Sequence, residues 1–483
     1  MKTNDKTIIV SISSGIIARN FLTIPGGFLS GIKASFKKVV LVVPESTKEH
    51  FIREFGNEQI LVESVPDDNY TDENNSIPKK IFSFLYTYLL FSENAKGLAW
   101  EGVYLSKRPK DTWYGRISYC VKWLIGNTIG KSKFVRRKLI PKLDKFIYRR
   151  KFYSDLFFKY EPVAVFVPNV EKWQDICLIR EARQNNISSI GMPGSWDHLP
   201  KRFRPLHPDL LLVNTYTQKY EAVQYQSYIE SRVKVVGVPF YDAFSTKKFV
   251  KSREEFCNQL GLDPRKKIVF FASEGIYAPD DGDVADMLVE GILNNSFSAE
   301  AQLIIRPYPG GIGEHEKFDK FKEVEGVYVD WAENLFDKTN IDPWYPTFSD
   351  VIHFINLLFH CDININTYSS IAIEASIFRK QCIGINFDGY KERPLDMSIR
   401  RLRKKIHLQN IIETDAVDYA NSKDELFEKV NKLLLCENPN PKIEVLRNKM
   451  CGPLDGRTGE RIALAITEEV TNTSQVNFVN DLK

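Results

Sequence analysis

The chain has 483 residues, of which 43% are hydrophobic and 27% charged, with a formal net charge of +4. This length and composition are typical of a globular protein with at least two domains. The seven cysteines are scattered and include no Cys-x-x-Cys pair. That pattern argues against a zinc site or a disulfide framework and favours reduced thiols in the cytosol.

The amino terminus leads into a short apolar run, Ile8–Val10 and Ile12, which predicts a first strand and not a signal peptide. The longest apolar run, Ile81–Phe91, has about half the length needed to cross a bilayer. No transmembrane segment is expected.

Apolar strands alternate with helical stretches along most of the chain, which favours parallel α/β layers. The strands expected in the first half are 7–12, 38–43, 59–62, 164–167, 189–192, 210–214 and 233–236. Those expected in the second half are 267–272, 302–306, 327–330, 363–366 and 382–385. The main helices expected are 176–185, 217–225, 284–294, 348–359, 370–379 and 423–434.

A Gly/Pro turn and a polar link, Gly237–Lys248, separate the two halves. We therefore predict a first Rossmann-like domain over 1–245, a second over 246–455, and a crossover helix and tail over 456–483. Ligands of such domains lie at the carboxyl ends of the strands.

The segment Lys107–Lys151 holds fifteen Lys/Arg and two acids, so its charge is +13 while the remainder carries about −9. Aromatic residues, among them Trp113, Tyr114 and Trp123, are interleaved with the cations. This insertion, about 100–155, favours contact with an anionic membrane surface or an acidic acceptor. A solvated helical hairpin and a nucleic-acid surface are the alternatives.

The segment Asp362–Ser376 is a short strand running into a helix, with Ser369 and Ser370 at the join and Glu374 one turn further on. Unpaired N–H groups at a helix start suit a phosphate. A carboxylate on this otherwise apolar helix needs a partner, and a ribose diol would be one. The structural alternative is a capped core helix with one glutamate at its edge.

Seven segments together resemble the GT-B glycosyltransferase superfamily, particularly its surface-polysaccharide and CDP-glycerol glycerophosphotransferase-like branches. The segments are 15–20, 194–199, 208–214, 236–242, 305–309, 366–375 and 452–461. The resemblance implies two Rossmann-like domains facing across a cleft, with the last helix packing back on the first domain. Tyr308 stands where a histidine often follows Arg-Pro in this family, so no histidine contact with phosphate is implied there.

In the family the second domain binds the nucleotide donor. The resemblance implies that Ser369 and Ser370 contact the donor phosphates, that Glu374 contacts the ribose, and that Arg306 neutralises the diphosphate. Thr367 is a further contact with the donor nucleotide. Ser273 and Glu274, in a turn after a strand, are further contacts. Arg457, in a Gly-rich loop before the last helix, is expected to close over the donor. No metal and no cofactor besides the nucleotide-activated substrate is implied, and Asp280–Asp283 is interpreted as a solvated loop.

The acceptor is expected in the first domain, near Gly15, Arg19 and Asn20. Asp197 and His198 are the best local acid/base pair for taking a proton from an acceptor hydroxyl. Glu45, Asp67 and Asp68 remain possible bases.

The function expected is sugar transfer from a nucleotide-activated donor to a surface-polysaccharide or lipid-linked glycan, in the cytoplasm or peripherally on the inner face of the membrane, without nucleic acid. The alternatives are polyol-phosphate transfer from a CDP-linked donor, nucleotide-sugar 2-epimerisation, and a non-catalytic glycan- or membrane-binding module. The basic insertion argues against epimerisation, since a small soluble substrate needs no such surface.

Overall fold

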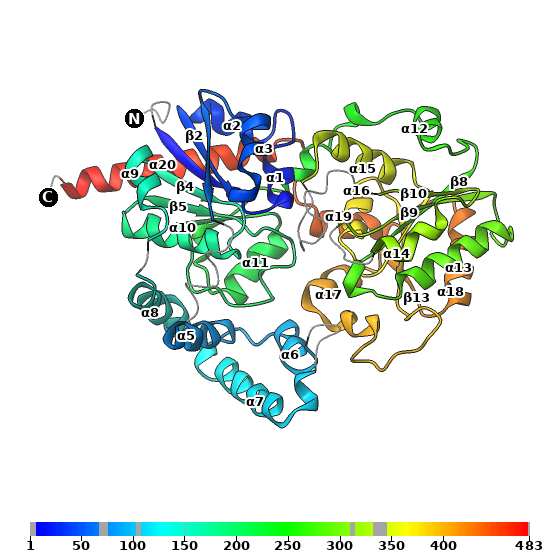
Figure 1. Ribbon diagram of the computed structural model, residues 1–483, viewed down its shortest axis with the longest axis horizontal. Helices are drawn as coiled ribbons and strands as arrows, with labels where there is room; N and C mark the ends of the chain where they lie inside the picture. Colours follow the sequence, from blue (N-terminus) through cyan, green and yellow to red (C-terminus); the bar gives the residue numbers. More distant parts are fainter. Residues whose placement is uncertain are drawn as a thin grey trace. The chain divides into compact units, whose positions relative to one another are not determined.

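The computed structural model describes residues 6–66, 76–102, 108–149, 151–309, 314–331 and 345–481, with side chains as far as residue 472. Two compact units are present (Figure 1). Unit 1 comprises residues up to 102, Lys107–Asp242 and Gly452 onwards, whereas unit 2 comprises chiefly Ala243–Cys451. From the sequence we predicted domain boundaries after residues 245 and 455.

Unit 1 contains a seven-stranded parallel sheet in the order β3-β2-β1-β4-β5-β6-β7. Its strands are β1 (Thr7–Ser11), β2 (Lys38–Pro44), β3 (Ile60–Val65), β4 (Ala164–Val167), β5 (Ser188–Gly191), β6 (Leu210–Val213) and β7 (Val233–Val235). Its α-helices are α1 (Gly15–Phe21), α2 (Phe28–Ser35), α3 (Lys48–Phe55), α5 (Ile77–Thr87), α6 (Glu93–Trp100), α7 (Trp113–Asn127), α8 (Ile140–Ile147), α9 (Ser154–Tyr160), α10 (Trp173–Gln184), α11 (Tyr216–Tyr225) and α20 (Thr458–Asp481).

Unit 2 contains a six-stranded parallel sheet in the order β10-β9-β8-β11-β12-β13. Its strands are β8 (Lys267–Ala272), β9 (Ala301–Arg306), β10 (Val327–Val329), β11 (Ile363–Asn366), β12 (Gln381–Ile385) and β13 (Val417–Ala420). Its α-helices are α12 (Arg253–Leu260), α13 (Asp281–Leu293), α14 (Glu314–Phe318), α15 (Phe348–His360), α16 (Ile371–Ile377), α17 (Ile406–Ile412), α18 (Lys423–Leu434) and α19 (Lys442–Met450).

Both sheets follow the Rossmann order 3-2-1-4-5-6, to which unit 1 adds a seventh strand. The predicted α/β class with two Rossmann-like domains is therefore confirmed. The strand positions also agree within a few residues, because strands buried on both faces read as nearly continuous apolar runs. β13 was missed, since Asp418 interrupts a four-residue edge strand.

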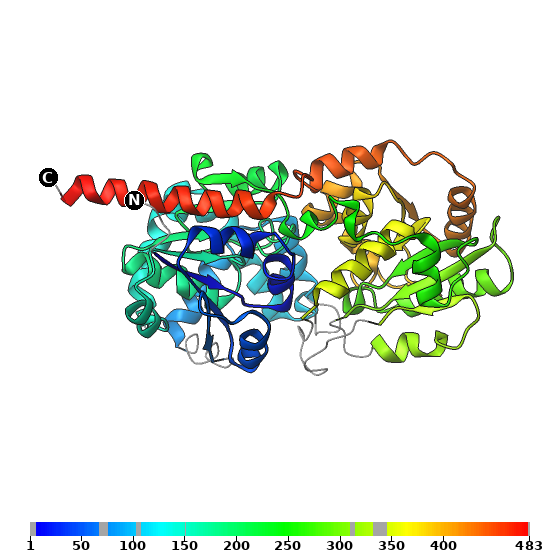
Figure 2. The same ribbon diagram turned by 90° about the horizontal axis from the view of Figure 1, so that it is seen from above.

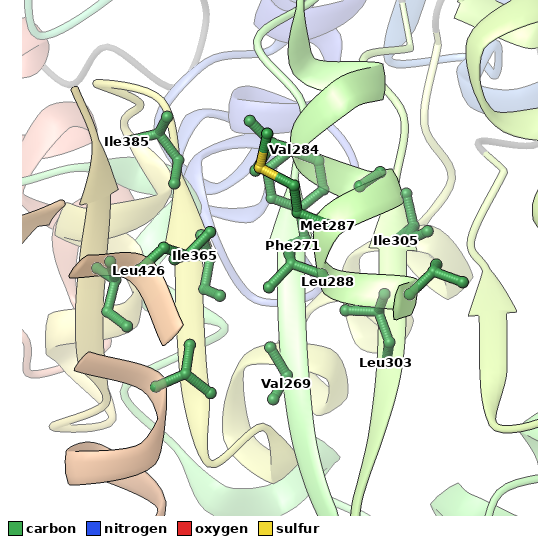
Figure 3. Close-up of a cluster of buried hydrophobic side chains, with 14 of the residues drawn as sticks. Val269, Phe271, Val284, Met287, Leu288, Leu303, Ile305, Ile365, Ile385 and Leu426 are labelled. Carbon is green, nitrogen blue, oxygen red and sulfur yellow. The ribbon is translucent and has the colours of Figure 1, made fainter. Parts of the chain in front are cut away.

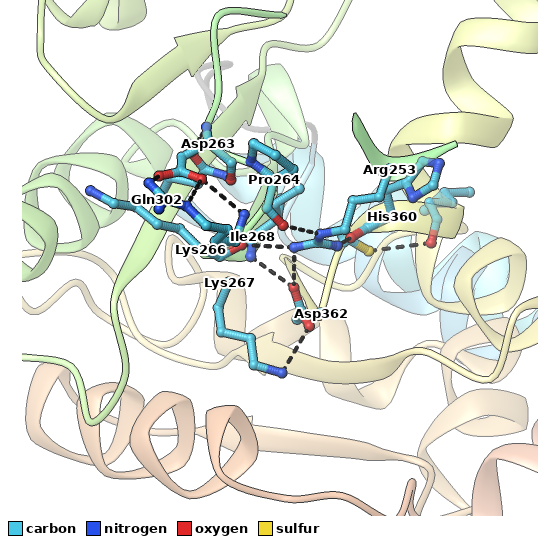
Figure 4. A network of polar contacts seen from close by, with 12 residues as sticks. Arg253, Asp263, Pro264, Lys266, Lys267, Ile268, Gln302, His360 and Asp362 are labelled. Atoms are coloured by element: carbon cyan, nitrogen blue, oxygen red, sulfur yellow. Dashed lines mark hydrogen bonds and ion pairs between the residues drawn. The ribbon is translucent and has the colours of Figure 1, made fainter. Parts of the chain in front are cut away.

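The core of unit 2 lies between its sheet and the helices on one face. Phe271 and Ile365 project from neighbouring strands toward Val284 and Leu288 of α13 (Figure 3). At the amino ends of β8 and β11, Arg253 donates to the carbonyl oxygens of Pro264, Lys266 and His360 and pairs with Asp362 (Figure 4). This network fixes the strand ends that lie opposite the carboxyl edge of the sheet.

The last helix belongs to unit 1, as the resemblance implied. α20 runs along α2 (Figure 2). The contact is close because Gly31 faces Ala463 and Gly459 faces the backbone of Gly27 and Phe28, where a Cβ atom would collide. Asp242 accepts hydrogen bonds from the backbone N–H groups of Thr458 and Gly459, at 3.0 and 2.9 Å, and so caps the start of α20.

Candidate functional site

The carboxyl ends of three strands meet at the centre of the unit 2 sheet. Ala272 of β8 pairs with Arg306 of β9 on one side and with Asn366 of β11 on the other. The strand order reverses between β8 and β11, which is where ligands of open α/β sheets bind. The loops leaving this point are Ser273–Gly275 and Thr367–Ser370, and both were predicted from the sequence.

Asp281, at the start of α13, joins these two loops. Its carboxylate accepts hydrogen bonds from the Thr367 hydroxyl, at 2.9 Å, and from the Glu274 backbone N–H, at 2.7 Å. Burial raises the pKa of Asp281 to about 7, although these hydrogen bonds lower it. The loops on both sides of the switch point are thus held by one buried carboxyl group.

Two residues that were predicted to contact the donor have hydroxyl groups that are engaged within the protein. Thr367 is fully buried with its hydroxyl on Asp281. The Ser273 hydroxyl donates to Glu314, at 2.9 Å, and accepts from the Gly275 N–H, at 3.1 Å. Both hydroxyls are engaged within the protein and position the loops, and contact of Thr367 and Ser273 with the donor stays a prediction.

Ser369 and Ser370 differ from these residues. Neither hydroxyl forms a hydrogen bond with any residue that the structure describes, and Ser370 occupies the N-cap of α16 without capping it through its side chain. The loop before them is fixed: the Asn366 side chain accepts from the Ser369 N–H at 3.1 Å, and the Tyr368 hydroxyl donates to Asn386 at 2.7 Å. Tyr368 has a φ of +54°, a strained conformation for a large side chain.

Glu374 is only 7% exposed and interacts within the protein. It lies near Cys451, whose pKa is raised to about 12, chiefly by burial and additionally by the Glu374 charge. The Glu374 carboxylate is therefore surrounded by protein atoms and has a partner within the protein. Its contact with a ribose stays a prediction.

Arg306 was expected to neutralise a diphosphate, but its charge is already paired. Its Nη1 lies 2.5 Å from Oδ2 of Asp330, and its guanidinium lies 4.9 Å from the centre of the Phe354 ring. Asp330 also contacts Nε2 of His353, at 2.7 Å. Burial alone would raise the pKa of Asp330, but Arg306 and His353 outweigh it and lower that pKa. Arg306 is therefore partly buried and ion-paired beside β9 and β10, and its contact with a diphosphate stays a prediction.

The segment Asp280–Asp283 is not the solvated loop that the sequence suggested. Asp280 forms a bidentate pair with Arg393 at 2.5 and 2.7 Å, Asp281 is buried, and Asp283 accepts from the Tyr390 N–H at 3.1 Å. These carboxylates thus face different partners. Within the described ranges, no group of three or more His, Cys, Asp or Glu side chains is arranged to hold a metal ion.

Asp197 and His198 lie together in unit 1, on the loop after β5. Asp197 pairs with Lys201, and its Oδ1 lies 4.0 Å from Nε2 of His198. On the other side of the ring, Nδ1 lies 3.4 Å from Oε2 of Glu171, which in turn pairs with Arg204. Glu171 and Arg204 come from separate loops, and their place in this cluster was not predicted from the sequence.

The His198 imidazole is half-buried. Burial lowers its pKa to about 4, against the opposing influence of Asp197. The ring is therefore neutral near pH 7, and as a base it is weaker there than an ordinary histidine. This cluster stays a predicted general base, whereas Glu45 is an exposed residue and Asp67 and Asp68 lie outside the described residues.

The predicted acceptor-side residues lie at the carboxyl end of β1. Gly15 begins α1, and the Arg19 guanidinium lies 3.8 Å from the centre of the Phe240 ring while its Nε donates to Asn20 at 3.1 Å. Just before them, the Ser13 hydroxyl donates to Asp175 at 2.8 Å. The Ser11 hydroxyl donates to the other oxygen of the same carboxylate. Burial raises the pKa of Asp175 to about 7, so unit 1 has its own buried carboxyl group beside its switch point.

Arg457 lies in unit 1, whereas the other predicted donor contacts lie in unit 2. Its side chain is 68% exposed and pairs with Glu460, at 2.8 Å. An exposed pair of this kind, one helical turn apart, is a typical surface interaction. The structure contains no observation that assigns Arg457 to a donor site.

The basic insertion folds onto unit 1 through two of its own cations. The buried Arg136 donates to the carbonyl oxygens of Leu89 and Tyr225, and Arg137 donates to those of Ser227 and Tyr228. These two arginines are structural and are not available to lipid phosphates. Lys107 and Arg150 lie outside the described residues. The described helices include none with the length and apolarity that a membrane crossing requires.

The sequence matches no protein-family model and no curated protein. Solved structures are similar. The UDP co-structure of MnaA from S. aureus has 11% identity and a TM-score of 0.51, over 96% of this chain and 97% of that one. A putative UDP-N-acetylglucosamine 2-epimerase from Listeria monocytogenes has 11% identity and a TM-score of 0.50, over 96% of both chains.

A glycosyltransferase from Rickettsia africae ESF-5 has 12% identity and a TM-score of 0.49, over 97% of this chain and 99% of that one. At such identities the similarity establishes the fold and not the reaction. Together with the two sheets in Rossmann order and the return of α20 to unit 1, it shows that this chain has the GT-B fold.

Proposed function

We propose that the protein is a glycosyltransferase that uses a nucleotide-activated sugar and binds the donor diphosphate beside Ser369 and Ser370. One observation carries the proposal. Neither hydroxyl has a hydrogen-bond partner among the described residues, at a switch point where Asp281, Thr367, Ser273 and Tyr368 are all engaged in holding the loops. Polar groups that are held in place but left unpaired are suited to a ligand rather than to the fold.

In the proposed reaction, the bond between the sugar C1 and the diphosphate oxygen breaks while a bond from C1 to an acceptor oxygen forms. The nucleoside diphosphate leaves with the bonding electrons. Hydrogen bonds from the serine hydroxyls stabilise its charge. The acceptor hydroxyl gives its proton to the cluster of Asp197, His198 and Glu171, whose neutral imidazole accepts it.

Transfer of a polyol phosphate from a CDP-linked donor is the second candidate. The same two hydroxyls would hold the diphosphate. In this reaction the acceptor oxygen bonds to the phosphorus of the polyol phosphate, the bond from that phosphorus to the bridging oxygen breaks, and CMP leaves with the bonding electrons. Epimerisation is less well supported, because the exposed aromatic residues of the basic insertion suit a large acceptor. A surface-polysaccharide or lipid-linked glycan on the inner face of the membrane is the acceptor that we propose.

Nucleotide binding tests the proposal. Calorimetric titration of the full chain with UDP, GDP, CDP, CMP and dTDP compounds is expected to find one nucleotide family that binds. Ser369→Ala/Ser370→Ala should weaken that binding, while Ser349→Ala, an exposed serine on α15, should not. If a folded protein binds none of these compounds, or the double variant binds as the parent does, the proposal fails. Product analysis with the donor that binds then separates sugar transfer from polyol-phosphate transfer and from a non-catalytic module.

A further inference from the structure

Helix α7 carries an apolar stripe on its solvent side. Trp113, Ile117, Val121 and Leu124 are 75%, 52%, 43% and 54% exposed. Their spacing of four, four and three residues places them on one face of the helix. The outward face of a surface helix is normally polar, so α7 has the reverse arrangement.

The opposite side of α7 holds the helix against unit 1. The Tyr119 ring packs edge-on against Phe91, with ring centres 5.7 Å apart, and against Trp100, at 4.9 Å. Gly126 is buried where a Cβ atom would collide with Phe91. The helix thus packs against unit 1 through one face, and this packing holds the apolar stripe on the opposite face.

Exposed cations that pair with no acid among the described residues occur along the same insertion, on α7 and on the segments that follow it. The exposed ones within residues 108–149 are Arg116, Lys131, Lys133, Lys138, Lys142, Lys145 and Arg149. Within residues 108–149 the acids are Asp111, which pairs with Arg108 at 2.7 Å, and the buried Asp144, which pairs with Arg180 at 2.8 Å. The exposed charge of the region is therefore strongly positive.

We propose that this face of α7 docks on an anionic bilayer, with its apolar side chains at the boundary between headgroups and acyl chains and the cations at the lipid phosphates. Charge selects this occupant. A second copy would bring two cationic surfaces together, and nucleic acid would place phosphates against Trp113 and Leu124. An anionic membrane matches both the apolar stripe and its surroundings. The inference rests on the proposed function, because it identifies α7 as the surface through which the protein reaches a lipid-linked acceptor.

The cysteines offer a direct test. Cys120 and Cys436 are the exposed ones, and the other five are buried. Cys120 lies on α7 between Ile117 and Val121, whereas Cys436 follows α18 in unit 2. An environment-sensitive dye is attached to Cys120 in a Cys436→Ala protein, and to Cys436 in a Cys120→Ala protein. With vesicles containing phosphatidylglycerol, the emission at position 120 should shift to the blue and that at 436 should not.

Variants measure the contribution of the stripe. Trp113→Ser/Ile117→Ser should weaken cosedimentation with these vesicles by about tenfold or more, given the apolar area removed from the interface. Phe158→Ser is the matched control, because Phe158 is 88% exposed on α9, outside the insertion. Salt should weaken binding in both the parent and the control.

Three results would overturn the inference: no blue shift at position 120, equal binding to pure phosphatidylcholine, or self-association that the double variant abolishes. Nucleotide titration of the same samples keeps the two proposals separate. Nucleotide binding without vesicle binding contradicts docking alone, whereas vesicle binding without nucleotide binding contradicts the proposed function alone.

Discussion

Thr367 and Asp281 are joined across the switch point of unit 2, where the threonine hydroxyl donates to the carboxylate at 2.9 Å. The two residues are 86 positions apart, and both are buried. Their bond makes the loop after β11 and the start of α13 one rigid part. This part presents Ser369 and Ser370, whose hydroxyls have no hydrogen-bond partner among the described residues.

Removing the Thr367 hydroxyl should therefore affect stability, whereas removing those of the two serines should not. Thr367→Val leaves a buried carboxylate oxygen without its donor, which costs about 1–3 kcal/mol of unfolding free energy. Ser369→Ala/Ser370→Ala should leave the melting temperature unchanged and raise the nucleotide Kd about ten- to a hundredfold. Calorimetry measures both quantities on the same samples, and the opposite pattern would assign the serines to the fold.

The buried Asp281 should make stability depend on pH. Its folded pKa, about 7, lies above its ordinary value of 3.8, so the folded state holds a proton that the unfolded state has lost between these values. The unfolding free energy should therefore fall as pH rises from about 4 to 7, by at most about 1.4 kcal/mol per pH unit from this group. Asp175 contributes in the same direction.

Asp281→Asn, compared with the parent by denaturant titration at pH 5 and pH 7, isolates the contribution of Asp281. The stability difference between the two proteins should change in favour of the variant at the higher pH. A difference that is the same at both pH values would show that Asp281 ionises normally.

Arg306 should prove structural. Arg306→Ala leaves Asp330 buried with His353 as its remaining partner, which is expected to cost about 3–5 kcal/mol of unfolding free energy. Arg265→Ala, which removes an exposed pair with Asp263 in the same unit, should change the melting temperature little. Equal melting temperatures for the parent and Arg306→Ala would show that the guanidinium is held for a ligand instead.

His198 should act as a neutral base over the ordinary pH range. Because burial lowers its pKa to about 4, protonation of His198 should reduce kcat/KM near pH 4 and not near 6.5. His198→Gln and Glu171→Gln should each lower kcat more than they weaken nucleotide binding. A loss of activity near pH 6.5 that disappears in His198→Gln would contradict the assigned burial.

The start of α20 provides a further comparison. Arg457→Ala should leave both nucleotide affinity and melting temperature unchanged, since the side chain is exposed and pairs with Glu460 on the surface. Asp242→Ala removes the buried cap of α20 and should cost about 1–2 kcal/mol of unfolding free energy, whereas Asp242→Asn should retain part of the cap. Weaker nucleotide binding by Arg457→Ala would restore its predicted role.

Local sequence patterns predicted the fold better than they predicted the contacts within the candidate site. Buried parallel strands are nearly uninterrupted apolar runs, so β8 and β11 were predicted with their observed ends. Hydrogen bonds between distant segments have no such pattern. Asp281 was misinterpreted because its partner Thr367 is brought to it only by the sheet, and Glu171 was missed for the same reason.

The pairing of Arg306 could have been inferred. Asp330 follows β10 just as Arg306 ends β9, and successive parallel strands place their carboxyl ends side by side. A cation and an acid at neighbouring strand ends thus predict an ion pair. Arg136 and Arg137 illustrate a different limit, since the charge composition of the insertion does not distinguish a solvated cation from one that binds backbone carbonyl groups.

The return of α20 to unit 1 has a consequence for biosynthesis. Ile462 and Ile466 of α20 are fully buried in a unit whose other residues precede position 243. On the ribosome, the polypeptide of unit 2 therefore emerges in full before the first unit receives its final helix. Until then α2 exposes the surface around Gly31 that α20 later covers. The half of the protein that is synthesised first is thus the half that completes its folding last.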